Sequence, residues 1–74
     1  MKCTITEVET KRSYEFSADA FCKKLASFLV LYEVHKTEEE QKVIYTRCRL
    51  AIALNSIFLY ECNGFKFMAV PERR

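Results

Sequence analysis

Near the N-terminus, apolar and polar residues alternate, which predicts β-structure. The segment 3–9 (CTITEVE) alternates and is rich in Thr and β-branched residues, as strands are. A polar break follows at 10–13, and the alternation resumes at 14–16. We expect either a second short strand that folds back or a single long, bent strand over this part of the chain.

The next segment has helical spacing. Ser17 is a suitable N-cap, and Asp19 lies in the first turn, where it favours the helix dipole. From Ala18 onward, apolar residues recur every three or four positions, which predicts a helix. Beyond Phe28 the segment is apolar on most sides, so a strand over 28–34 is the rival interpretation. The expected apolar stripe is Phe21, Cys22, Leu25, Phe28, Leu29 and Tyr32.

A second helix is predicted to begin after Thr37 and to run to about Leu54. Glu40 stands three residues after Thr37, which is the spacing of a capping box. The positions expected to face inward are Val43, Ile44, Cys48, Leu50, Ala51 and Leu54. The positions expected to face outward are Glu38, Lys42, Tyr45, Thr46 and Arg49.

The run 57–70 (IFLYECNGFKFMAV) predicts a β-hairpin. Asn63-Gly64 lies between two apolar segments, and a type I′ turn needs positive φ at both of its central residues. A two-residue loop pairs Glu61 with Lys66, opposite charges that are favourable across a ladder. This register runs from Cys62–Phe65 to Ile57–Val70. One face then holds Phe58, Tyr60, Cys62, Phe65 and Phe67, and the other holds Ile57, Leu59, Met68 and Val70.

Together these elements predict one α+β domain over residues 1–74. We expect a three- or four-stranded antiparallel sheet with two helices packed on one face, in the order β(β)ααββ. Both faces of the hairpin are apolar, but two helices can cover only one face of a small sheet. Either a second subunit or a partner covers the other face, or strand twist and the N-terminal segment hide it within the monomer. The sequence leaves open which face is covered.

Composition and charge narrow the function. Half of the 74 residues are apolar, and each half of the chain holds six basic and five acidic residues. A dedicated nucleic-acid binder usually has a stronger basic stripe. We expect no membrane segment, because no apolar run is long enough. The first residues do not resemble a signal peptide, so a cytoplasmic location with free thiols is expected for the four cysteines.

Few residues in the chain could carry out catalysis. The single histidine, His35, lies in the predicted loop between the helices, where it is expected to be solvated. Cys22 and Cys48 lie on apolar helix faces, and burial there raises a thiol pKa and makes the thiol unreactive. The cysteines lack the close pairing typical of zinc sites, and the only glycine belongs to the turn. We therefore expect no enzyme activity, cofactor, metal site or small-molecule substrate.

The leading hypothesis is a small non-catalytic module that binds a protein partner stoichiometrically or associates with itself as a homodimer. In size and lack of catalytic groups it resembles inhibitors of phages and mobile elements, anti-CRISPR proteins included, although no motif carries the resemblance. The alternatives are a nucleic-acid-binding module, using the Lys42/Arg49 helix face or the hairpin aromatics, and a subunit of a larger complex. The residues expected to contact the partner are Phe58, Tyr60, Phe65, Phe67, Lys42, Tyr45 and Arg49.

Overall fold

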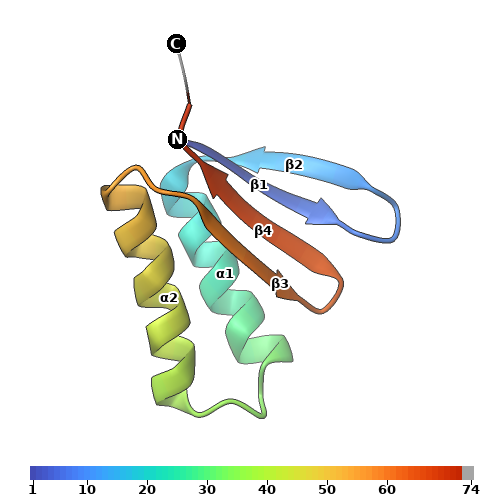
Figure 1. Cartoon of the computed structure of the whole chain (residues 1–74). Coiled ribbons are helices and arrows are strands. Elements are labelled where there is room, and N and C mark those ends of the chain that lie inside the picture. The colour runs from blue at the N-terminus through green and yellow to red at the C-terminus, as the bar shows by residue number, and fades with distance from the viewer. Residues whose placement is uncertain (73–74) are drawn as a thin grey trace.

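The strands form one antiparallel sheet in the order β2-β1-β4-β3, and both helices lie on the same side of it (Figure 1). This computed structural model describes residues 1–72. The predicted α+β class and the order ββααββ are confirmed. The elements are β1 (Lys2–Glu7), β2 (Arg12–Phe16), α1 (Ala18–Tyr32), α2 (Glu38–Ala53), β3 (Phe58–Cys62) and β4 (Phe65–Val70).

Two separate strands form at the N-terminus, so the alternative of one bent strand is wrong. The chain reverses between β1 and β2, where Lys11 adopts a φ of 61° and donates its backbone N–H to the Glu7 carbonyl at 2.7 Å. The two strands then pair from Glu7–Arg12 to Cys3–Phe16. β1 also pairs with β4, so it lies in the middle of the sheet, and β2 and β3 form the two edges.

The β3–β4 hairpin has the predicted register. Asn63 and Gly64 adopt φ values of 51° and 79°, as a type I′ turn requires. Glu61 lies opposite Lys66, and the ladder extends to Phe58–Ala69. The predicted last pair, Ile57–Val70, lies outside this ladder because β3 begins at Phe58.

Both helices begin at the predicted caps. The Ser17 hydroxyl accepts the Ala20 N–H, and both hydrogen bonds of the Thr37–Glu40 capping box are present. α1 continues to Tyr32, so the rival strand over 28–34 is wrong. The helical spacing persists there because Leu29 is buried and Phe28 packs its ring against aromatic rings of β4.

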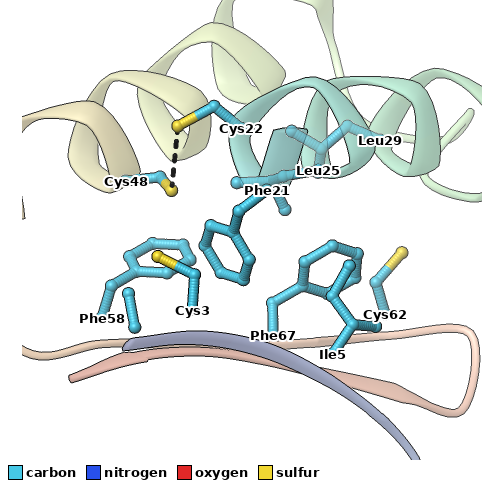
Figure 2. Close-up of a cluster of buried hydrophobic side chains, with 11 residues drawn as sticks. Cys3, Ile5, Phe21, Cys22, Leu25, Leu29, Cys48, Phe58, Cys62 and Phe67 are labelled. Atoms are coloured by element: carbon cyan, nitrogen blue, oxygen red, sulfur yellow. Dashed lines mark hydrogen bonds between the residues drawn. The ribbon is translucent and has the colours of Figure 1, made fainter. Parts of the chain in front are cut away.

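The core lies between the helices and one face of the sheet (Figure 2). Phe21 of α1 makes edge-to-face contacts with Phe58 and Phe67, at ring centroid distances of 6.4 and 5.7 Å. All four cysteines are free and buried, as predicted. The buried residues are Cys3, Ile5, Phe21, Cys22, Leu25, Leu29, Cys48, Phe58, Cys62, Phe67 and Ala69.

The inward positions of α2 are only partly those predicted. Cys48 is buried and Ile44 and Ala51 pack against the core, but Leu50 and Leu54 are exposed. Val43 is exposed as well, so the prediction is wrong for these three apolar residues. α2 packs against α1 and against the edge strand β3, which leaves one flank of its apolar surface without a neighbour.

Candidate protein-binding site

The aromatic face of the hairpin is the face that the helices cover. Phe58 and Phe67 are buried in the core, whereas Tyr60 and Phe65 are half-buried and packed against it. Phe58 and Phe67 therefore have no surface to offer to a partner, and we remove them from the candidate site. Their burial also decides which hairpin face is open: it is the face that carries Leu59 and Met68.

The three predicted residues of α2 do not form a surface suited to stacking on bases. Tyr45 is half-buried and packs against the core, contrary to its predicted outward position. Lys42 and Arg49 are exposed, and Nη1 of Arg49 lies 3.8 Å from Oδ1 of Asp19. This carboxylate reduces the positive charge on the helix face, and Tyr45, the aromatic residue predicted for that face, is half-buried.

The open face of the sheet changes character from one edge to the other. The register places Glu15, Thr4, Met68 and Leu59 in one row across the four strands. Because side chains alternate between faces along each strand, this row lies on the face opposite the helices. In this row the open face is polar over β2 and β1 and apolar over β4 and β3, whereas another row of the same face carries Lys66 and Glu61.

At that edge of the sheet, exposed residues of α2 and of the chain leading into β3 line a groove between the two elements. We call this the β3 groove; its volume is about 380 Å³. Leu50, Leu54, Ile57 and Leu59 line it, and each is between 55% and 65% exposed. Isolated surface leucines are common, but several large apolar side chains in one depression are typical of an interaction surface. The remaining lining residues are Arg47, Ala51, Ser56 and Phe58.

Backbone groups of β3 that point away from β4 also lie at the β3 groove. The Val8 N–H donates to the Gly64 carbonyl at 2.9 Å, just beyond Glu7–Phe65, the last pair of the β1–β4 ladder. In an antiparallel sheet, alternate residues of a strand direct their N–H and C=O groups to opposite neighbours. The even-numbered residues of β4 therefore bond to β1, and the odd-numbered residues bond to β3. On β3, the backbone N–H and C=O groups of Phe58 and Tyr60 point to β4. Those of Leu59 lie in the plane of the sheet and point away from β4.

The two edges of the sheet differ in how well their residues prevent pairing with another chain. Exposed edge strands invite pairing with other chains unless charged or polar residues discourage it. Arg12, Ser13 and Glu15 occupy the exposed edge at β2. β3 presents Leu59 and one charged residue, Glu61, and the apolar Ile57 precedes it. β2 also presents the exposed Tyr14, but β3 has fewer charged and polar residues and is therefore the less protected edge.

A second apolar patch lies at the C-terminal end of α1. Val30, Leu31 and Val34 are all more than 60% exposed. This patch lacks the outward strand groups that lie at the β3 groove, because it lies on a helix and the turn that follows. We therefore treat it as secondary.

Burial raises the pKa of three of the core thiols, those of Cys3, Cys48 and Cys62. Burial, followed by proximity to Cys22, raises the pKa of Cys48 to about 12. Burial, followed by a hydrogen bond to Glu33, raises the pKa of Cys62 to about 11. His35 is exposed, as predicted, with its Nε2 3.3 Å from Oε2 of Glu33. Neutral thiols are poor nucleophiles and poor metal ligands, so this environment favours packing over chemistry.

Compared with known proteins, the chain matches no family, no curated protein and no solved structure. Its function is therefore inferred from the surface described above. Within residues 1–72, neither helix has the length and apolar character needed to cross a lipid bilayer.

Proposed function

We propose that this chain is a non-catalytic module that binds another protein stoichiometrically through the β3 groove. The observation that supports the proposal is that four large, exposed apolar residues line one groove: Leu50, Leu54, Ile57 and Leu59. Burying such side chains against a partner removes apolar surface from water, which is the main favourable term in protein association.

The composition of the groove supports a protein partner over a nucleic acid. Among residues 1–72, Arg47 is the only charged residue that lines it, whereas nucleic-acid binding depends on several phosphate contacts. A protein interface typically has an apolar centre with a polar rim, and arginine is enriched in it. The β3 groove has this composition.

The proposal is tested with variants that place a charge in the groove. Leu50→Asp and Leu54→Asp change exposed side chains, so both should remain folded by circular dichroism. Val34→Asp is the matched control, because it places the same charge at an exposed apolar side chain in the other apolar patch. Proteins captured from the native host on the wild-type chain are identified and purified, and calorimetry then measures affinity and stoichiometry with each variant.

We expect an integral stoichiometry with the wild-type chain and with Val34→Asp, and at least a hundredfold loss of affinity with either groove variant. A partner whose affinity is unchanged by both groove variants would contradict the proposal. Light scattering on the chain alone tests self-association: a dimer that Leu54→Asp dissociates would show that the groove binds a second copy instead. A complex that persists for hours would indicate a subunit of a larger assembly, and rapid exchange would indicate a regulator.

A further inference from the structure

We infer that the β3 groove binds an extended segment of the partner protein, which adds to the sheet as a fifth strand beside β3 and places an acidic side chain at Arg47. This inference rests on the proposed function and specifies the chemistry of the partner. Three features support it: the outward backbone groups of β3, the apolar wall of α2 and the charge of Arg47.

The backbone of β3 can pair with a further strand without any rearrangement. Leu59 and Glu61 direct their N–H and C=O groups away from β4, as the ladder pattern requires. A segment that lies antiparallel or parallel to β3 satisfies these groups and gains a regular set of main-chain hydrogen bonds. Peptides that add to sheet edges in this way derive affinity from the main chain and specificity from alternate side chains.

The neighbouring helix supplies that specificity. Every second side chain of an added strand points to the face that α2 flanks, because side chains alternate along the strand. On that face, the added side chains meet Leu50, Leu54 and the aliphatic part of Arg47, which line the groove with β3. We therefore expect apolar residues at alternate positions of the bound segment.

Arg47 selects one acidic residue among them. It is exposed and lines the groove, and among residues 1–72 no carboxylate lies within 4 Å of its guanidinium. Arg49, two residues further along α2, already has a carboxylate nearby, since its Nη1 lies 3.8 Å from Oδ1 of Asp19. A carboxylate on the bound segment would form a charge-assisted, bidentate pair with Arg47, and such pairs are specific as well as favourable.

A second copy of this chain does not meet these requirements. If β3 paired with β3 of another copy about a two-fold axis perpendicular to the sheet, both α2 helices would lie on the same side of the joined sheet. The only carboxylate of β3 is Glu61, which pairs with Lys66 on the open face and so points away from the groove. The occupant is therefore a different chain with an acidic residue on its groove-facing side.

The probe is a phage-displayed library of random dodecapeptides, selected on the immobilised chain. We expect enriched peptides with apolar residues at alternate positions and an Asp or Glu on the same side. A synthetic enriched peptide is then methylated at one backbone amide at a time. Strand addition predicts that affinity falls at least tenfold at every second amide and changes little at the others. The phase relative to the acidic residue distinguishes antiparallel from parallel addition.

Two variants of the chain complete the test. Arg47→Glu should weaken the peptide at least tenfold, and replacing the peptide's acidic residue by Lys should restore binding. Leu59→Pro removes an outward N–H without removing a β3–β4 hydrogen bond, so it should also weaken binding; Leu59→Thr, which keeps the N–H, is its control. Proline is tolerated at such positions of an edge strand.

The inference would be overturned by a selection that enriches nothing, by a methylation profile without a two-residue period or by binding that ignores Arg47→Glu. If one of these results is found while Leu54→Asp still abolishes binding of the captured partner, the groove binds protein in another way and the proposed function stands. If Leu54→Asp leaves that partner's affinity unchanged, the proposed function itself fails.

Discussion

Phe67 is the side chain on which the choice of covered face depends. It lies on the central strand β4, is fully buried and makes edge-to-face contacts with Phe21 and Phe28 at centroid distances of 5.7 and 5.2 Å. Phe65, two residues earlier on the same face, is only half-buried and contacts one ring, that of Phe28. Replacing each by leucine therefore compares a fully buried core position with a half-buried position at the edge of the core on the same strand.

The expected costs follow from these contacts. Each edge-to-face pair contributes about 0.5–1.5 kcal/mol beyond area burial. Phe67→Leu loses two pairs and leaves a small cavity, so the free energy of unfolding should fall by about 2–3 kcal/mol. Phe65→Leu loses one pair at a half-exposed position and should cost about 0.5–1 kcal/mol. The free energy of unfolding of a domain of 74 residues is roughly 4–11 kcal/mol, so both variants should still fold.

Urea unfolding followed by far-UV circular dichroism measures the difference. A domain of this size has an m-value of about 1 kcal/mol/M, so the midpoint of Phe67→Leu should lie roughly 2 M below that of the wild type. In a thermal scan, a loss of about 2 kcal/mol should lower Tm by roughly 8–16 °C. A midpoint of Phe67→Leu equal to that of the wild type would refute the assignment of the aromatic face to the core, and with it the assignment of the open face and the β3 groove.

Three further predictions concern the caps, the turn and the thiols. Thr37→Ala removes the capping hydroxyl of α2 and should lower the free energy of unfolding in urea by about 1 kcal/mol. Thr46→Ala, at an exposed position within the same helix, is the control and should change it by less than about 0.5 kcal/mol. Equal effects of the two variants would contradict the capping role. Gly64→Ala should cost about 1–2 kcal/mol by the same measurement because φ is 79°, although no atom lies within 4 Å of the added methyl group; an unchanged midpoint would show that the turn adopts another conformation. The pKa of the Cys48 thiol is about 9 in the unfolded chain and about 12 in the folded one, so the contribution of this thiol to the free energy of unfolding should be complete below pH 9 and fall by up to about 1.4 kcal/mol per pH unit above it. Urea midpoints measured from pH 7 to 11 should therefore decline less steeply in Cys48→Ala than in the wild type. Parallel declines would contradict this.

Local signals predicted the elements and the hairpin register, because they depend on residues close together in the chain. Thr37 and Glu40 cap α2 wherever the helix packs, and Asn63-Gly64 sets the pairing of β3 with β4 without help from the rest of the fold. The pairing of β1 with β4 is different, since about sixty residues separate the partners. No local pattern specifies that register.

The candidate site could not be predicted because it depends on this long-range pairing. Once Thr4 is known to lie beside Met68, the polar residues of β1 mark the open face, and the aromatic residues must face the helices. From the sequence alone the two apolar faces of the hairpin are equivalent. Partner contacts are therefore predicted on the face with the bulkier, aromatic side chains, and the structure buries two of these, Phe58 and Phe67, in the core. Leu50 and Leu54 were missed for a related reason: the apolar surface of α2 is wider than the contact that an edge position provides, and spacing does not show which flank is left uncovered.

The distribution of small and large side chains supports a function in binding. Four cysteines and Ala69 make up five of the eleven buried core residues, while Leu50, Leu54, Ile57 and Leu59 remain exposed. A sequence optimised only for its own stability would place the larger side chains inside, since burying one stabilises by about 1.5–3 kcal/mol. Exposed leucines beside an edge strand also carry a risk of aggregation, which β2 avoids with polar residues and β3 does not. A protein can retain such a surface when a partner covers it, and the outward backbone groups of β3 indicate that this partner is bound, at least in part, through its backbone.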